Sequence, residues 1–391
     1  MAAAAKAASS AAGAANGFVP RAVFEVSASI TRSYFLGHHT AALTSMRKVL
    51  SNIGLILECR DSRVPLTSTN PLLESSLASR DRIIVYTKSD LCAPATSTRW
   101  LARQQSLLTE WHQNSPSSGS GVIGGRTEVV FTDERNPRSI QRLLALVKER
   151  AAAQDSLLGL RALVVGMPNA GKSTLLNALR RVGMRLPGAA RTGAQPGVTR
   201  KLSTPVRIVA ATETSDGAYN DAQDVGEGVF VVDTPGVFVP YVSDLESMLK
   251  LSLVGCVKDG LVPAETIADY MLFLINQRDP TIYADLSAPT NDVQEFLDAV
   301  AVRTGKLLKG GVPAREHAAD WVVQQWRRGH LGRFGLDDIS EEGLKARATR
   351  LALEQNEGDA PLSLSQARKR EKEARKARSL AKRAAALDPT S

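Results

Sequence analysis

The chain has 391 residues, of which 43% are hydrophobic, so it is long enough for two or three domains with buried cores. Its formal net charge is +9, and the two ends carry it: residues 1–48 hold five basic residues against one acidic, and residues 366–391 hold nine against three. No apolar run is long enough to span a bilayer, and the three distant cysteines match neither a metal-ligand pattern nor a disulfide framework, so we expect reduced thiols.

The first 31 residues are rich in alanine and serine, with scattered basic residues and a single acid, Glu25. This composition is typical of a mitochondrial presequence, and we expect residues 1–31 to be disordered. The alternative is an alanine-rich N-terminal segment that is not a targeting signal.

A short apolar run at residues 53–57 predicts a buried strand, and a polar loop with Asp61 and Arg63 follows it. Ligands of open α/β sheets gather at the carboxyl ends of strands, although Asp61 and Arg63 could equally form a local ion pair. Before this strand, His38 and His39 stand beside a glycine. They are either catalytic residues or surface residues.

The next predicted strand, residues 82–86, leads into Thr87-Lys88-Ser89-Asp90. This tetrapeptide resembles the guanine-reading motif N/T-K-x-D. The carboxylate of Asp90 can accept hydrogen bonds from N1–H and the exocyclic amine of guanine, whereas adenine offers no such pair of donors. The stem of Lys88 can lie along the plane of the base.

A phosphate-binding loop, G-x-x-x-x-G-K-S, occupies residues 166–173. It follows an apolar run at 162–165 and precedes a segment with helical spacing, so its glycines can turn backbone N–H groups toward phosphate oxygens at a helix N-terminus. Lys172 can reach the outer phosphates, and Ser173 can hold Mg²⁺. Because a strand is predicted before this loop and a helix after it, the alternative interpretation as an ordinary glycine-rich turn is disfavoured.

Two switch segments follow the phosphate loop. The glycine-rich stretch 191–200 contains Thr199, which could contact Mg²⁺ and the γ-phosphate. The apolar run 229–232 predicts a strand that delivers Asp233-Thr234-Pro235-Gly236, a D-x-x-G motif. Asp233 would belong to the Mg²⁺ shell, and the N–H of Gly236 would sense the γ-phosphate; the alternative is an ordinary turn.

From residue 243 to about 338 the apolar residues recur at helical spacing, which predicts a small all-helical domain. The basic run at 366–383 has no apolar face, so it is either a solvated helix, a disordered end or a segment that binds RNA phosphates. The predicted fold class is α/β, a P-loop domain with a mostly parallel sheet and helices on both faces, followed by a small all-α domain. The predicted divisions are a presequence at 1–31, the P-loop domain at 32–240, the helical domain at 241–345 and a basic tail at 346–391.

The order of these motifs is unusual because the guanine-reading motif comes first and the D-x-x-G motif last. This order resembles the circularly permuted GTPases of the YlqF/RbgA type, in particular their mitochondrial ribosome-assembly members. The motifs that carry the resemblance are Phe35-x-Gly37-His38, Asp61-x-Arg63-x-Pro65, Asn70-Pro71, Thr87–Asp90, Gly166–Ser173, Pro196-Gly197-x-Thr199, Asp233–Gly236, Gly310-Gly311 and Arg327 to Gly332.

The resemblance implies a GTPase that uses Mg²⁺ and K⁺ and acts in assembly of the large subunit of the mitochondrial ribosome. It implies a monomer in the mitochondrial matrix, with a peripheral position on the inner membrane as a further expectation. Asn169 matches the asparagine that the family uses for the monovalent cation, and His38 matches its catalytic candidate. Val237 stands where other GTPases have a glutamine, so we expect slow intrinsic hydrolysis that a ribosomal partner stimulates.

The motifs and the resemblance together assign three sets of residues. Catalysis is assigned to Lys172, Thr199, Gly236 and His38. Nucleotide contacts are assigned to Thr87, Lys88, Asp90, Asn169, Ala170, Gly171, Lys172, Ser173, Thr174 and Gly236. Metal contacts are assigned to Ser173, Thr199, Asp233 and Asn169. Three alternatives stay open: a P-loop kinase or ATPase, an RNA-binding protein with a silent nucleotide site, and a membrane-associated matrix protein.

Overall fold

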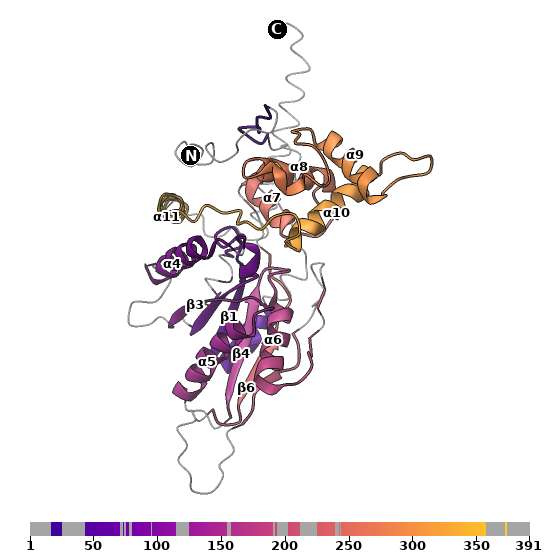
Figure 1. Cartoon of the computed structure of the whole chain (residues 1–391). Helices are drawn as coiled ribbons and strands as arrows, with labels where there is room; N and C mark the ends of the chain where they lie inside the picture. The colour runs from indigo at the N-terminus through magenta and orange to yellow at the C-terminus, as the bar shows by residue number, and fades with distance from the viewer. Residues whose placement is uncertain are drawn as a thin grey trace.

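The computed structural model shows a sheet with helices on its faces and a cluster of helices at one end of it (Figure 1). The residues that it describes are 17–25, 44–70, 73, 76–77, 80–94, 96–114, 125–154, 158–190, 192–193, 202–211, 225–238, 242, 244–356 and 372–373. Within these residues no helix is long and apolar enough to cross a membrane.

Six strands form one sheet in the order β3-β2-β1-β4-β6-β5. Their bounds are β1 Leu55–Asp61, β2 Arg82–Thr87, β3 Thr127–Phe131, β4 Leu160–Gly166, β5 Val206–Val209 and β6 Val229–Asp233. All neighbouring pairs are parallel except β5 and β6, which are antiparallel. The predicted fold class and the strands predicted at 53–57, 82–86, 162–165 and 229–232 are confirmed, as is a further strand that the sequence predicts at 128–132. The sequence reasoning missed β5, because a four-residue edge strand is too short to show a period.

The central strands are buried on both faces, as their apolar runs predict. On one face, β1 and β4 pack against α5 (Pro137–Ala153) and α6 (Lys172–Met184). On the other face, Ile84 and Tyr86 of β2 pack against Leu107 and Leu108 of α4 (Thr98–Asn114). The parallel strands therefore all point their carboxyl ends toward the helical cluster (Figure 1).

The helical cluster has its own apolar core. Its helices are α7 Leu245–Leu253, α8 Ala264–Asn276, α9 Val293–Thr304 and α10 Arg315–Arg327. Asp244 and Asp292 cap α7 and α9 by accepting hydrogen bonds from the free N–H groups of the first turn. Phe296 and Trp326 are buried at the centre, and Met167 of the phosphate loop belongs to the same core. The helical cluster is therefore packed onto the carboxyl edge of the sheet.

The chain returns to the sheet after α10. The N–H of Leu336 donates to the carbonyl of Arg63 at 2.7 Å, and Leu344 packs in the cluster that covers β2. Leu344 lies in α11 (Glu341–Asn356), so the predicted domain boundary at residue 345 falls inside a helix. The boundary differs because Ile339 and Leu344 are apolar and pack on a surface beside α4. The sequence pattern alone does not show where that surface lies.

Residues 17–25, inside the predicted disordered presequence, pack against the helical cluster. The guanidinium of Arg21 pairs with Asp269 at 2.5 Å, and Phe24 meets Tyr270 edge-on with 5.2 Å between ring centroids. Asn291 donates to the carbonyl of Val19 at 2.8 Å. The expectation of disorder is therefore wrong for residues 17–25, because Phe24 and Arg21 find partners far away in the sequence.

Replacing Phe24 by alanine should lower the free energy of unfolding by about 1–2 kcal/mol, because a half-buried ring loses two aromatic neighbours, Tyr270 and Phe273. Urea unfolding of the full chain measures this change. Val23 is the matched control: its side chain is 73% exposed, so Val23→Ala should leave stability unchanged. Equal stability of both variants would contradict the packing of this segment.

Candidate active site

Three motifs of the sequence meet at the carboxyl edge of the sheet because their strands are neighbours in register. Asp61 at the end of β1 lies opposite Thr87 at the end of β2, and Cys59 lies opposite Gly166 of β4. Asp233 at the end of β6 pairs with Val164 of β4. Strand pairing alone therefore brings the base-reading motif, the phosphate loop and the D-x-x-G motif together.

The phosphate loop has the backbone that an anion cradle requires. Gly166 and Gly171 have φ values of +142° and +81°, and Asn169 has a φ of +56°. A Cβ at Gly166 would stand 2.3 Å from the carbonyl oxygen of Cys59, so only glycine fits there. The loop ends at the first residue of α6, so the free N–H groups of that helix face the same space.

Lys172 is buried beneath this loop, where its ammonium donates to the carbonyl oxygen of Met167 at 2.7 Å. Burial lowers the pKa of Lys172, and the nearby charge of Asp233 partly opposes this effect. The lysine is thus held within reach of the loop interior, where a cation can neutralise phosphate oxygens.

Ser173 and Asp233 form the other polar pair of the site. The Ser173 hydroxyl donates to Oδ2 of Asp233 at 2.5 Å, and Oδ1 of Asp233 is buried with no hydrogen-bond partner among the described residues. Burial raises the pKa of Asp233, while Ser173 and Lys172 oppose this effect. A carboxylate and a hydroxyl side by side are ligands that Mg²⁺ prefers, and the unpaired buried carboxylate oxygen of Asp233 fits the role of a Mg²⁺ ligand.

The base-reading motif is tied to the phosphate loop by its side chains. Thr87 donates its hydroxyl to the carbonyl of Ala170 at 2.9 Å, and Lys88 donates to the carbonyl of Asn169 at 2.8 Å. Asp90 is half-buried on the wall of a cavity of about 250 Å³, which Thr174 also lines. Burial and then the charge of Asp133 raise the pKa of Asp90. The cavity thus connects the phosphate loop with a carboxylate that can read a base.

Five polar residues of this cavity were not assigned from the sequence: Thr132, Glu134, Arg135, Arg327 and Arg328. Thr132 to Arg135 follow β3, so the rule that ligands gather at strand ends could have found them. Arg327 and Arg328 come from the end of α10. The resemblance included Arg327 without a role, and no local signal placed either arginine at the base-reading motif.

Asp61 and Arg63 form more than a local ion pair. Both are buried, and Arg63 holds Asp61 through two bonds of 2.9 and 2.8 Å. Lys88 donates to the same carboxylate at 2.8 Å. On its far side, the guanidinium of Arg63 lies 4.9 Å from the ring centre of Trp326 and donates to the carbonyl of Arg327 at 3.3 Å. This network connects the base-reading motif to α10.

The phosphate loop also contacts the helical cluster directly. The side-chain amide of Asn169 donates to the carbonyl of Gly255, which follows α7, at 2.8 Å. Gly255 has a φ of +84°, and a Cβ there would meet Asn169 and Arg327 at 3.3 Å. Two further assigned residues, Thr199 and His38, lie outside the described residues.

The sequence matches the family described as 50S ribosome-binding GTPase over residues 161–303. Mitochondrial GTPase 1 of Schizosaccharomyces pombe is 38% identical over 352 residues, which cover 88% of this chain and 99% of that relative. The chain belongs to this family of GTPases. The resemblance noted in the sequence is confirmed, and with it the binding and hydrolysis of GTP, for which the family ordinarily uses Mg²⁺.

Other similarities cover most of this GTPase. Mitochondrial ribosome-associated GTPase 1 of Xenopus tropicalis is 29% identical over 78% of this chain and 94% of its own length. The crystal structure of GNP-bound YlqF from T. maritima is 23% identical, covers 77% of this chain and 99% of that chain, and has a TM-score of 0.45. The matched family segment begins at residue 161, after Thr87–Asp90, in agreement with the permuted order of the motifs.

Replacing Gly236 by alanine should slow single-turnover GTP hydrolysis about 100-fold. A Cβ at Gly236 would stand 2.6 Å from the backbone N and Cα of Pro168, so the D-x-x-G motif must move away from the phosphate loop. Gly335→Ala is the control, because the nearest atom to its Cβ is 3.9 Å away. Hydrolysis at the wild-type rate in Gly236→Ala would exclude this close approach.

Proposed function

We propose that this GTPase acts in mitochondria as a nucleotide-controlled factor in assembly of the large ribosomal subunit. The names of relatives support this: one is called a mitochondrial GTPase and others mitochondrial ribosome-associated GTPases. The basic ends of the chain suit a polyanionic partner. We place the protein in the matrix as a monomer, with the anionic inner membrane as a secondary surface.

The observation that carries the proposal is the meeting of Lys172, the Ser173–Asp233 pair and Asp90 at one edge of the sheet. Lys172 would neutralise charge on the β- and γ-phosphate oxygens, and Ser173 and Asp233 would hold Mg²⁺. The metal supplies positive charge that stabilises the oxygens of the transferred phosphoryl group. Thr199 and Gly236 would close on the γ-phosphate, and His38 is the proposed further catalytic residue.

Intrinsic hydrolysis should be slow, on the order of 10⁻³ s⁻¹ or less. Val237, which follows Gly236, is 1% exposed and packs with Leu163 and Val165, so its side chain cannot orient a water molecule. Activation would come from the ribosomal partner and from K⁺ held near Asn169. A slow enzyme that its partner accelerates is suited to act as a checkpoint.

Contacts between the nucleotide site and the helical cluster could transmit a change at the nucleotide to that cluster. Asn169 of the phosphate loop binds Gly255, and Lys88 reaches α10 through Asp61 and Arg63. A change in the bound nucleotide would therefore alter the contacts of α10 and of the residue that follows α7, and the helical cluster would transmit this change to the ribosome.

GTP hydrolysis by the purified protein, with and without large mitochondrial ribosomal subunits, tests the proposal. We expect the subunits to raise the rate at least tenfold in KCl and less in NaCl. Stimulation that is equal in both salts would remove K⁺ from the mechanism. No stimulation in either salt would reject the ribosome as the activator.

The mature protein should retain residues 17–25, because Arg21 and Phe24 are built into the helical cluster. We therefore expect presequence cleavage to occur before Gly17. Mass spectrometry of the N-terminal peptide of the protein isolated from mitochondria measures the site. A mature N-terminus beyond Phe24 would contradict this prediction.

A further inference from the structure

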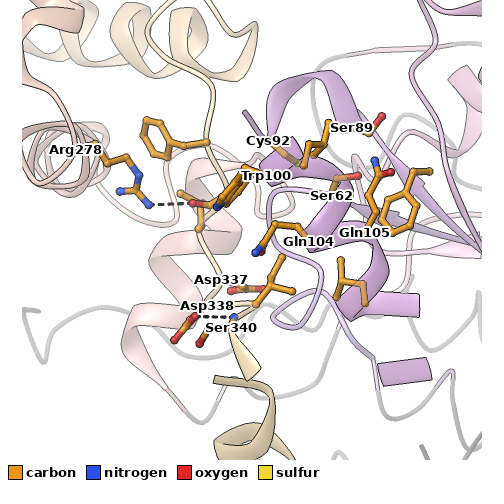
Figure 2. Close-up of a pocket in the computed structure, with 17 residues that line it drawn as sticks. Ser62, Ser89, Cys92, Trp100, Gln104, Gln105, Arg278, Asp337, Asp338 and Ser340 are labelled. Atoms are coloured by element: carbon orange, nitrogen blue, oxygen red, sulfur yellow. Dashed lines mark hydrogen bonds between the residues drawn. The ribbon is translucent and has the colours of Figure 1, made fainter. Parts of the chain in front are cut away.

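A second and larger cavity, of about 430 Å³, lies between α4 and the segment 334–340 that returns from the helical cluster (Figure 2). It shares no lining residue with the nucleotide cavity. Its inner wall contains Ser62, which follows Asp61, and Ser89, which precedes Asp90. The cavity is therefore next to the base-reading motif, on the side that faces away from the nucleotide cavity.

The walls of this cavity favour a flat apolar ligand. Their apolar part is formed by Leu101, Leu108, Phe131, Phe334, Leu336 and Ile339. Trp100 stands at the cavity with 49% of its surface exposed, more than any other aromatic side chain among the described residues. An indole left in water beside an apolar cavity is a platform on which a planar ring can stack.

One polar group in the same cavity is poorly satisfied. The hydroxyl oxygen of Ser62, a residue that is 5% exposed, has no oxygen or nitrogen hydrogen-bond partner among the described residues, and it interacts only with the thiol of Cys92, a weak partner. A buried hydroxyl without a strong partner costs free energy that a ligand could recover. Gln104 and Gln105 bring two amide groups, each a donor and an acceptor, to the same cavity (Figure 2).

Three charged side chains line the cavity: Arg278, Asp337 and Asp338. Arg278 lies 4.2 Å from the ring centre of Phe334 and donates to the carbonyl of Gly335 at 3.0 Å, and it forms no ion pair with a described carboxylate. Asp337, by contrast, accepts from the N–H groups of Leu66 and Thr67 at 2.8 Å. Asp338 accepts from the N–H of Ser340 at 2.9 Å. Arg278 also donates to the carbonyl of Leu274 at 2.9 Å, so neutral groups orient the one cationic side chain of this lining.

We propose that this cavity binds one unpaired nucleotide of an RNA strand. The base stacks on Trp100 and enters between α4 and segment 334–340, its edge bonds to Gln104, Gln105 and the Ser62 hydroxyl, and its phosphate pairs with Arg278. Unpaired bases that stack on aromatic rings beside a guanidinium are the usual basis of single-strand RNA recognition. The inference rests on the proposed function, because the ribosome is the expected source of the RNA.

Fluorescence anisotropy of a labelled single-stranded 12-nucleotide RNA tests the proposal, with the full chain saturated with GDP so that the nucleotide site is occupied. We expect Trp100→Ala and Arg278→Ala each to weaken binding about tenfold. Arg303→Ala removes one charge from the exposed face of α9, away from the cavity, and should change the affinity less than twofold. The same RNA as a duplex should bind several-fold more weakly than the single strand.

Three outcomes would overturn the proposal. One is equal RNA affinity of Trp100→Ala and the wild type. Another is binding of free AMP as tightly as the RNA, which would indicate a small nucleotide as the ligand. The third is loss of ribosomal stimulation in Trp100→Ala with RNA affinity unchanged, which would indicate a protein ligand. If ribosomal subunits stimulate hydrolysis normally in Trp100→Ala and RNA affinity is unchanged, the proposed function stands and this inference falls.

Discussion

Replacing Asp90 by asparagine should lower the affinity for GDP about 1,000-fold and favour xanthosine diphosphate. The carboxylate of Asp90 faces the base cavity, where it can accept hydrogen bonds from N1–H and the 2-amino group of guanine. An asparagine amide would point a donor at that amino group, whereas xanthine carries an acceptor oxygen at the same position. Competition of both nucleotides against fluorescent GDP measures the two affinities.

Asp133→Asn is the matched control for this change. Asp133 lies close enough for its charge to raise the pKa of Asp90, yet it does not line the cavity, and its own carboxylate accepts from the N–H of Arg135 at 2.8 Å. We expect its GDP affinity to change only a few-fold and its preference for guanine to remain. An unaltered preference for guanine in Asp90→Asn would mean that another group reads the base.

Replacing Asp61 by asparagine should lower the free energy of unfolding by about 3–5 kcal/mol. The carboxylate is fully buried and compensates Arg63, which is 1% exposed, and Lys88. Without its charge, a buried guanidinium is left unpaired in a site of low dielectric constant. Urea unfolding of the nucleotide-free protein measures the loss.

Asp298→Asn is the control for this ion pair. Asp298 pairs with Arg315 through two bonds of 2.6 and 2.7 Å, but the pair is exposed on the helical cluster, so its loss should change stability little. If Asp61→Asn does not fold, Arg63→Lys keeps the charge and removes the paired geometry, and it should still destabilise. Equal stability of Asp61→Asn and Asp298→Asn would contradict the role of the buried network.

The effect of Asp61→Asn should depend on pH. Burial alone would raise the pKa of Asp61, but the charges of Arg63 and Lys88 outweigh it and hold that pKa well below its usual range. The unfolded chain titrates near the ordinary value of about 3.9, so below about pH 5 it binds more protons than the folded protein does. The difference in stability between wild type and Asp61→Asn should therefore be constant above about pH 5 and shrink as the pH falls through 4.

Much of the sheet was predictable because its strands are local apolar runs. The buried parallel strands β2 and β4 are nearly continuous apolar stretches in the sequence, and their ends were predicted to within two residues. The edge strand β5 has no such signal. The packing of α11 beside α4 depends on Leu344 meeting a surface more than 200 residues earlier in the chain, so the predicted boundary at 345 was wrong.

The sequence by itself determined the phosphate loop, the base-reading motif and the D-x-x-G motif, because each is a short segment directly after a strand. Their chemistry depends on local backbone, as the left-handed φ of Gly171 shows. Only the tertiary structure decided that Arg328 lines the base cavity and that Gly255 binds Asn169, 86 residues away. Contacts of this kind depend on how two packed bodies meet, and no local pattern of residue types encodes that geometry.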